Sequence, residues 1–442
     1  MKDLNLLEKN LRRSNRHLRG KILYALEVFL LPPLYRVAEV IIALTGLILL
    51  GLPLLIGMAV RKLSTGKKIF SREIFIGDGG KPIDVNFFNL GWKPAASLAL
   101  LYSIVKGDLT FVGASLISYE QTELKPENNY LRKLKPGLFS LWGLRSNIKI
   151  GHEGRHETEW EYCFTKKHSA DAFIALRSIP AYILGGAEEQ TQTSVAIFDI
   201  AFENMTMQEA VTRIEADLDS ENAASTVFYV NADCLNKCYE DEDYHSLLKN
   251  ADYILPDGIG INIACRMLGS GLKENVNGTD MLPYMCTMAK RRGFKIFLLG
   301  GKPGVADKVA AKITESYEVQ VAGVQHGYFD HQKESGEVVD LINKSGADIL
   351  LVAFGAPLQE KWITAHKSQL EVGAAFGVGG LFDFYSGNTL RAPRWLRELG
   401  LEWVYRMIQE PGRMWRRYIV GNPLFIFRVM TWRTQNNSNQ GE

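Results

Sequence analysis

The chain has 442 residues, and because a domain typically has roughly 100–200 residues, two or three domains are expected. Fifty-one Lys and Arg nearly balance 49 Asp and Glu, so the net charge of +2 gives no whole-chain case for nucleic-acid binding. Five scattered cysteines exclude a secreted disulfide scaffold and fit a reducing, cytoplasm-facing protein. Cys234 and Cys238 lack a second Cys or His pair at zinc-site spacing, so we interpret them as small buried hydrophobes and expect no metal and no cofactor.

The first recognisable element is a long apolar segment, residues 37–60, which contains a single ionisable group, Glu39. A membrane-crossing helix needs about 20 apolar residues, so this segment is long enough to cross. Gly51, Leu52 and Pro53 interrupt it. Because proline removes a helical hydrogen bond and clashes with the preceding turn, we expect a break there.

Both flanks of the apolar segment are basic. Residues 1–36 carry eight Lys and Arg against three acids, and five more basic residues lie between residues 61 and 72. Positive charge favours the cytoplasmic side of a membrane, so both ends prefer that side. A kinked, re-entrant hairpin satisfies this preference, whereas one ordinary transmembrane helix is the alternative.

The rest of the chain divides into two parts. Between residues 77 and 186, short apolar runs mix with charge, and no long periodic helix stands out. The polar, unpatterned residues 187–193 predict a linker, so the expected domains are residues 1–186 and 194–442.

Six short apolar runs in the second part predict strands, separated by amphipathic stretches of helical length. This alternation predicts an α/β fold with a doubly wound, Rossmann-like parallel sheet, which binds ligands at the carboxyl ends of its strands. The predicted strands are Val227–Val230, Tyr253–Leu255, Lys295–Leu299, Val319–Val324, Ile349–Phe354 and Gly373–Gly377.

Several loops that follow these strands can carry chemistry. Asp257 lies just past the second strand, where an aspartate acts either as a general base or as a helix cap. The turn at residues 298–304 runs from a strand through glycines into a helix, which suits either a phosphate or a plain tight turn. It has neither the Rossmann nor the P-loop spacing. The junctions at residues 277–280 and 354–360 are cap-like, and His326 lacks a nucleophile to accompany it.

The C-terminal tail, residues 391–442, is rich in arginine and aromatic residues. It contains nine Arg against four Glu, interleaved with four Trp and two Tyr. Arginine beside interfacial aromatics suits an anionic membrane surface or a diphosphate ligand. No nucleic-acid recognition module accompanies it, so nucleic acid is not an expected partner.

Taken together, these motifs resemble one family over residues 194–427. The stretch is similar to the WecG/TagA/CpsF glycosyltransferases (glycosyltransferase family 26), and the motifs occur in the same order. They are PDGIG at 256–260, NGTD at 277–280, LLGGKPG at 298–304, HGYF at 326–329, FGAPLQEKW at 354–362, FDFYSG at 382–387, RAPRWL at 391–396 and LEWVYRMIQEPGRMWRRY at 401–418. The resemblance implies metal-independent, inverting transfer of a sugar from a nucleotide-diphosphate donor to a polyprenyl-diphosphate-linked sugar.

The same resemblance implies roles for individual residues. Asp257 is expected to be the catalytic base, and Gln359 to help position the substrates. Two departures from the family concern the donor sugar, since Tyr229 stands where Thr is common and Asn275 where Arg is common. The residues expected to bind the nucleotide sugar are Asn231, Gly258, Thr279, Asp280, Gly300, Gly301, Lys302 and Pro303, and those expected to bind the acceptor diphosphate are Arg406, Arg413 and Arg416. Spacings of seven and three residues place these three arginines on one helical face, so we expect them to converge on one anionic group.

Residues 20–186 resemble, more weakly, the bacterial sugar transferases that load a phosphosugar onto undecaprenyl phosphate. The shared features are the Pro-kinked apolar segment, GDGGKP at 77–82, YSIVKGDLTFVG at 102–113 and KPG at 135–137. Catalysis in that family depends on an Asp-Glu pair about ten residues before the KGD motif. Here Ala96 and Ser97 occupy those positions, and neither supplies a carboxylate nucleophile. We therefore expect this domain to be catalytically silent.

These inferences give one functional expectation. The chain is expected to be a glycosyltransferase at the cytoplasmic face of the bacterial inner membrane, in contact with the lipids there. It would use a UDP-sugar donor and an undecaprenyl-diphosphate-linked acceptor in exopolysaccharide, capsule or O-antigen assembly. The alternatives are a bifunctional enzyme that also loads the first phosphosugar, and a non-catalytic membrane scaffold for other polysaccharide enzymes.

Overall fold

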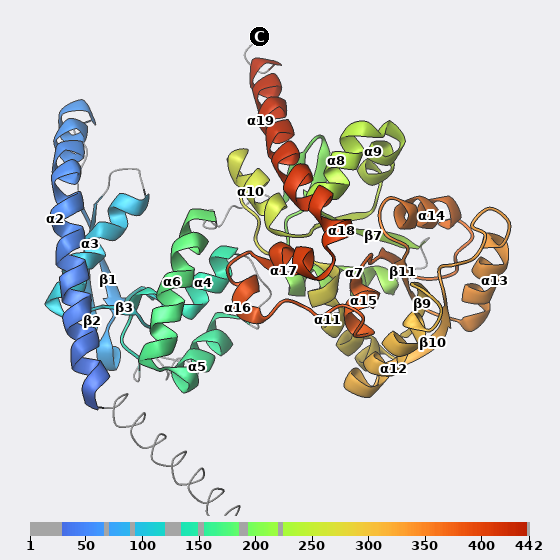
Figure 1. The fold of residues 1–442 in the computed structure, drawn as a ribbon, viewed down its shortest axis with the longest axis horizontal. Helices are drawn as coiled ribbons and strands as arrows, with labels where there is room; N and C mark the ends of the chain where they lie inside the picture. The colour runs from blue at the N-terminus through green and yellow to red at the C-terminus, as the bar shows by residue number, and fades with distance from the viewer. Residues whose placement is uncertain are drawn as a thin grey trace, which may run out of the picture. The chain divides into compact units, whose positions relative to one another are not determined.

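A computed structural model describes residues 29–65, 70–88, 93–119, 134–148, 154–184, 193–219 and 224–439. The chain divides into two compact units between Tyr182 and Ile183, with residues 146–151 counted in the second unit (Figure 1). The predicted linker lies outside the described residues except for Thr193, and so does the basic flank before residue 29.

The first unit consists mainly of helices with two small pairs of strands. Strands β1 and β2 pair antiparallel, and β3 and β4 pair parallel. Its elements are α2 (Leu31–Thr65), β1 (Phe70–Ile76), η2 (Asp78–Gly80), β2 (Pro82–Phe88), α3 (Lys93–Lys106), β3 (Thr110–Val112), β4 (Gly137–Phe139), α4 (Leu141–Ile148), α5 (Arg155–Thr165) and α6 (His168–Leu184).

Two of these helices did not stand out in the sequence. No long periodic helix was evident between residues 77 and 186, yet α3 has 14 residues and α6 has 17. Both sequences are apolar on most of their circumference rather than along one stripe. A helix of that kind gives little 3.6-residue periodicity, which is why the pattern missed it.

Helix α2 also corrects an expectation, because it runs without interruption from Leu31 to Thr65. The break expected at Pro53 is therefore wrong. A helix can accommodate one proline at the loss of a single backbone hydrogen bond when the surrounding turns stay intact. Within the described part of the chain, Leu31–Leu49 is the one stretch long and apolar enough to cross a membrane, and 11% of it is buried.

The single acid of the apolar segment joins α2 to the rest of the first unit. Glu39 is buried, and its carboxylate accepts hydrogen bonds from the backbone N–H of Phe111 at 2.6 Å and from the Thr110 hydroxyl. One turn earlier, Arg36 donates to the carbonyl of Ile104 at 2.7 Å. The carboxylate of Glu39, the one ionisable group of the apolar segment, is thus explained by its hydrogen bonds to the segment that follows α3.

The second unit is an α/β domain. All six predicted strands are present, as β7 to β12, and they form one parallel sheet in the order β10-β9-β11-β12-β7-β8. Its elements are β5 (Ser194–Ile197), β6 (Ile200–Glu203), α7 (Met207–Leu218), β7 (Ser225–Val230), α8 (Ala232–Glu240), α9 (Glu242–Lys249), β8 (Tyr253–Pro256), α10 (Ile259–Met267), α11 (Gly278–Arg292), β9 (Lys295–Gly300), α12 (Val305–Tyr317), β10 (Gln320–Gln325), α13 (Ser335–Ser345), β11 (Ile349–Ala353), α14 (Leu358–His366), β12 (Ala374–Gly377), α15 (Leu381–Tyr385), α16 (Arg394–Arg397), α17 (Glu402–Gln409), α18 (Pro411–Trp415), η5 (Arg416–Val420) and α19 (Gly421–Asn439).

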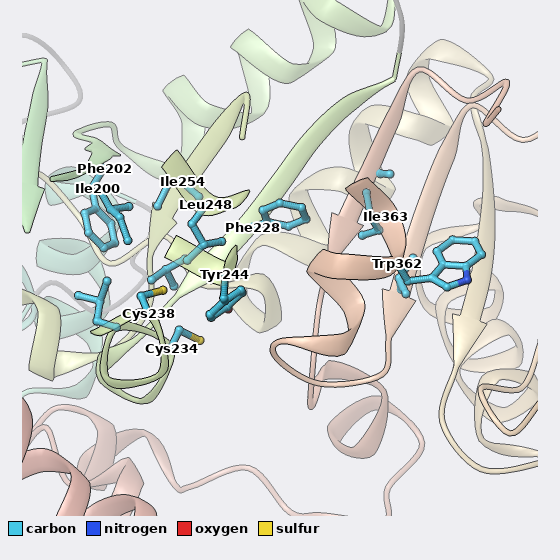
Figure 2. Packing of buried hydrophobic residues seen from close by; sticks show 14 of the residues in the cluster. Ile200, Phe202, Phe228, Cys234, Cys238, Tyr244, Leu248, Ile254, Trp362 and Ile363 are labelled. Atoms are coloured by element: carbon cyan, nitrogen blue, oxygen red, sulfur yellow. The ribbon is translucent and has the colours of Figure 1, made fainter. Parts of the chain in front are cut away.

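Alternate residues of the strands supply two separate apolar cores, one on each face of the sheet. In β7, Phe228 belongs to the core that includes α8, α9, α14 and α19, whereas Val227 belongs to the core that includes α7, α11 and α12. A sheet covered on both faces needs apolar residues at every strand position, which the short apolar runs provide. Cys234 and Cys238 pack in the first core, so their interpretation as buried hydrophobes is confirmed (Figure 2).

The order of the strands determines where a ligand can bind. From β7 the chain moves to β8 on one side, and it later returns so that β12 pairs with β7 on the other side. Helices that leave adjacent strands in opposite directions open a crevice at the carboxyl ends of those strands. The loops after β7 and β12 therefore mark the expected binding site.

Candidate active site

A cavity of about 970 Å³ opens at the carboxyl ends of β7, β8, β11 and β12. The loops after these strands form one part of its wall, and residues 384–424 of the C-terminal segment form another. Most of the predicted site residues meet here. Those that line the cavity are Asn231, Asp257, Gly258, Thr279, Asp280, Gln359, Arg406, Arg413 and Arg416.

Asp257 presents a carboxylate to this cavity and does not cap the helix that follows it. The N-cap residue of α10 is Gly258, and no side chain caps the first turn of α10. The Asp257 carboxylate lies 3.4 Å from the amide nitrogen of Asn231. Of the two alternatives that the sequence left open, the structure therefore does not support the helix cap. Asp257 is half-buried, and among the described residues this amide is the one hydrogen-bond partner of its side chain, so the carboxylate keeps acceptor capacity for a ligand.

Asn231 is held so that its amide nitrogen faces Asp257. It is the N-cap residue of α8, and its side-chain oxygen accepts from the backbone N–H groups of Asp233 at 3.1 Å and Cys234 at 3.2 Å. Because the oxygen is used in capping, only the N–H₂ end is left for the cavity side. The loop after β7 thus offers a hydrogen-bond donor next to the acid.

Asp280, in contrast, has partners for both carboxylate oxygens. One oxygen accepts from Arg391 at 2.6 Å, and the other accepts from the amide of Asn277 at 2.7 Å. Burial acts to raise the pKa of Asp280, but the hydrogen bond and charge of Arg391 outweigh it, so the pKa lies below its ordinary value. This carboxylate joins the C-terminal segment to the start of α11. A contact between Asp280 and the donor stays a prediction.

The glycine turn after β9 lies apart from this cavity, since residues 300–303 are not among those that line it. Gly300 has φ of +132°, and a Cβ there would lie 2.6 Å from the carbonyl oxygen of Ala353 in β11. The N–H of Gly301 donates to the same carbonyl at 3.1 Å. Close packing of β9 against β11 is therefore sufficient to explain both glycines. Phosphate binding by Lys302 and its neighbours stays a prediction.

Gln359 ties together the loops that follow β11 and β12. Its buried side-chain oxygen accepts from the N–H groups of Gly355 at 3.1 Å and Gly379 at 2.9 Å, and its nitrogen donates to Glu360 at 2.8 Å. These bonds fix the shape of the cavity wall. Glu360 is itself buried, and sequence reasoning missed it because a polar residue in a first helical turn ordinarily faces solvent.

The three predicted tail arginines line one cavity, but they do not share one helical face as their spacing suggested. Helix α17 ends at Gln409 and α18 begins at Pro411, so Arg406 and Arg413 belong to different helices. A proline disfavours helical backbone angles in the residue before it. Glu410, which precedes Pro411, accordingly has φ of −129° and ψ of 61°. The expectation of one continuous face is therefore wrong.

These arginines differ in how far their charge is neutralised. Arg413 pairs with Glu410 at 3.2 Å. Within the described residues Arg406 has no ion pair, and its guanidinium stacks over the ring of Phe384 at 4.9 Å. The Nε atom of Arg406 is buried and has no hydrogen-bond partner among the described residues. Arg416 is exposed and lies over the ring of Trp415 at 5.6 Å.

Three further arginines of the C-terminal segment line the cavity, and no motif had singled them out as ligands. Arg391 and Arg397 approach Asp280, and Arg417 lies 3.8 Å from Asp233. Six arginines in one wall favour an anionic ligand such as a diphosphate. Among the residues that the structure describes, no three His, Cys, Asp or Glu side chains are grouped as a metal site would need.

Comparison with known proteins matches the α/β unit that carries this cavity. Residues 195–439 match the sequence model of the Glycosyl transferase WecG/TagA/CpsF family. The chain is 32% identical over 231 residues to the N-acetylglucosaminyldiphosphoundecaprenol N-acetyl-beta-D-mannosaminyltransferase of Bacillus subtilis (strain 168), covering 52% of this chain and 88% of that protein. The protein of the same name from Bacillus spizizenii (strain ATCC 23059 / NRRL B-14472 / W23) is 29% identical over 221 residues, covering 50% of this chain and 84% of that protein.

The buried acid next to Gln359 leads to a prediction about pH and stability. Burial raises the pKa of Glu360 to about 7, whereas the ordinary glutamate value is about 4.3. Between these pH values the folded protein binds more protons than the unfolded chain, so its free energy of unfolding falls as pH rises. Glu360→Gln cannot ionise and keeps an oxygen for Gln359. We expect it to be more stable than the parent by about 3 kcal/mol at pH 8, with no such gain at pH 4.5.

Urea unfolding of both proteins at pH 4.5 and pH 8, followed by tryptophan fluorescence, measures this difference. Glu337→Gln, at an exposed position in the first turn of α13, serves as the control and should show no pH-dependent gain. A gain for Glu360→Gln that is the same at both pH values would contradict the prediction.

Proposed function

The chain belongs to the WecG/TagA/CpsF family of glycosyl transferases, and we propose that it transfers a sugar from a UDP-sugar to a saccharide carried on undecaprenyl diphosphate. The observation that carries this proposal is the carboxylate of Asp257, which does not cap α10 and lines a cavity that is rich in arginines. The names of the two relatives describe a sugar transfer onto N-acetylglucosaminyldiphosphoundecaprenol, which supports this class of acceptor.

In this proposal Asp257 is the general base. Its carboxylate takes the proton from the acceptor hydroxyl as that oxygen bonds to the anomeric carbon of the donor. The bond between the anomeric carbon and the diphosphate oxygen breaks, and its electron pair leaves with UDP. Attack opposite to the leaving group inverts the anomeric centre. The Asn231 amide holds the base, while Gln359 helps position the substrates by fixing the two loops that it joins.

The arginines supply the countercharge for diphosphate groups. Developing negative charge on a leaving group is stabilised most by donors already placed in a site with little water. Arg406, Arg413 and Arg416 are proposed to hold the diphosphate of the lipid-linked acceptor at the membrane surface, since they come from the tail that is rich in interfacial aromatics. Thr279, Asp280 and the glycine turn are proposed to contribute to the donor side.

The central assay uses the full chain in native membranes, N-acetylglucosaminyl-diphosphoundecaprenol, and a panel of UDP-N-acetylmannosamine, UDP-N-acetylglucosamine, UDP-glucose and UDP-galactose. Asp257→Asn keeps the size of the side chain but loses the base, and we expect turnover on the best donor to fall about 100-fold to 10,000-fold. UDP binding and thermal stability should change little. Turnover above a third of the parent value would rule out Asp257 as the base, and no turnover of the parent on any donor would reject the proposed reaction.

The different environments of the arginines give a second prediction. Arg406→Gln removes a charge that has no ion pair among the described residues, whereas Arg413→Gln removes one that Glu410 already partly neutralises. We therefore expect Arg406→Gln to raise the KM for the lipid-linked acceptor more than Arg413→Gln does, by at least about tenfold, since charge-assisted bonds are the stronger ones. Equal effects of the two variants, or a loss of activity that parallels a lower melting temperature, would point to a structural role.

For the first unit we propose a phosphoglycosyl transferase-like domain that no longer performs its reaction and serves as a platform for the lipid acceptor. This rests on Ala96 and Ser97 at the positions of the missing carboxylates and on the resemblance of its motifs. Helix α2 is proposed to hold the enzyme on the inner membrane, with the cavity on the cytoplasmic side where nucleotide sugars are made. Because α2 is unbroken, a crossing or tilted helix fits better than a hairpin. The product would enter exopolysaccharide, capsule or O-antigen assembly.

The proposed silence of this domain is tested by product analysis. The full chain, incubated with undecaprenyl phosphate and each UDP-sugar of the panel, should release no UMP above the background of membranes without it. UDP should appear once the lipid-linked acceptor is added. Release of UMP would establish the bifunctional alternative and would require another acid to replace the missing pair.

A further inference from the structure

The turn that carries Asp257 is fixed by two backbone hydrogen bonds to groups outside the turn. The N–H of Asp257 donates to the carbonyl of Val230 in β7 at 3.0 Å. The next N–H, that of Gly258, donates to the side-chain oxygen of Asn275 at 2.6 Å. Gly258 has φ of +93°, a conformation that glycine adopts readily and other residues rarely do. Among the residues that the structure describes, Asn275 is thus the one that bonds to this turn from the loop before α11.

Asn275 stands on a loop that is itself held rigidly. Asn204 donates to the carbonyl of Gly271 at 3.0 Å and accepts from the N–H of Lys273 at 2.7 Å. Glu274, immediately before Asn275, accepts from the N–H of Met207 at 2.7 Å. Both Asn204 and Glu274 are buried. A chain of short hydrogen bonds therefore extends from the start of α7 through the loop to the peptide that follows Asp257.

We propose that Asn275 is a positioning residue for Asp257, an inference that rests on the proposed function of Asp257 as the base. The bond from the Gly258 N–H to Asn275 holds Gly258 as the N-cap residue of α10. Asp257 then lies one residue before the N-cap. From there the carboxylate points to the cavity rather than to the free N–H groups of the first helical turn, which would otherwise attract it. The atom that faces an N–H must be an acceptor, so the amide oxygen of Asn275 performs this role.

Two substitutions at position 275 test this. Asn275→Ala removes the acceptor, and because a misplacement of about 1 Å can cost about 100-fold in rate, we expect kcat to fall about 10-fold to 100-fold. The KM for the best UDP-sugar of the panel should stay within about threefold. Asn275→Asp keeps an oxygen for the Gly258 N–H, so kcat should recover to within about fivefold of the parent value.

The pH profile of kcat/KM of the Asn275→Asp variant distinguishes a positioning role from a merely structural one. Its new carboxylate lies next to the turn of Asp257, and a nearby like charge disfavours the ionised form of a base. The acidic limb of the pH profile of kcat/KM should therefore move to higher pH in Asn275→Asp and stay in place in a control. Asn343→Ala is a matched control, since Asn343 also accepts a loop N–H, from Glu371 at 2.9 Å, but lies outside the cavity. It should keep the parent kcat.

The outcomes separate this inference from the proposed function. If Asp257→Asn is inactive while Asn275→Ala keeps the parent kcat, the positioning role is overturned and the base assignment stands. A donor KM raised more than tenfold with kcat unchanged would overturn it as well, because Asn275 would then be a donor ligand. If Asp257→Asn retains turnover, the base assignment of Asp257 and the positioning role of Asn275 are both overturned. If Asn275→Ala does not fold, the pH profile of Asn275→Asp still decides, and an unshifted acidic limb overturns the proposal.

Discussion

The pairing of the first strand of the sheet with the last one is the constraint on which the site depends. Because β12 lies beside β7, the loops after both strands open at the same edge, and β8 and β11 add theirs on either side. Residues separated by more than a hundred positions, such as Asn231 and Gln359, therefore meet around one cavity. Backbone hydrogen bonds of the sheet fix the strand ends, and side chains of neighbouring loops, such as Asn275, fix the turns that follow them.

The charged groups of the cavity divide into those with partners and those without. Asp280 is bound by Arg391 and Asn277, and Arg417 approaches Asp233. Pairs of this kind hold the C-terminal segment against the sheet domain, and their charges are already compensated. Asp257, Arg406 and Arg416 lack such partners among the described residues, which leaves one carboxylate and two cations uncompensated. In a site with little water, uncompensated charges of this kind interact most strongly with reacting groups.

The sequence predicted the sheet well because few folds other than a parallel sheet covered by helices are compatible with short apolar runs between amphipathic stretches. It also placed Asp257 at a strand end, where a single polar residue stands out. Sequence-based prediction failed where tertiary packing determines the local structure. The glycines at 300 and 301 are explained by the approach of β11, Glu360 is buried by packing around α14, and the break before Pro411 separates arginines that helical spacing had joined. Helix α2 stayed continuous although Pro53 predicted a break.

The position of Asn275 bears on our proposal that Asp257 is the base. Where the family resemblance implies arginine, this chain has a shorter side chain whose oxygen accepts from the N–H of Gly258. A guanidinium has only donors and cannot accept that N–H, so the two residues cannot do the same thing. Tyr229, the other departure, packs its ring against Gly278 and bonds to Met281 on the same wall. Tyr229 and Asn275 line the same cavity as Asp257, so under the proposed mechanism we expect both positions to affect how the donor sugar meets the base.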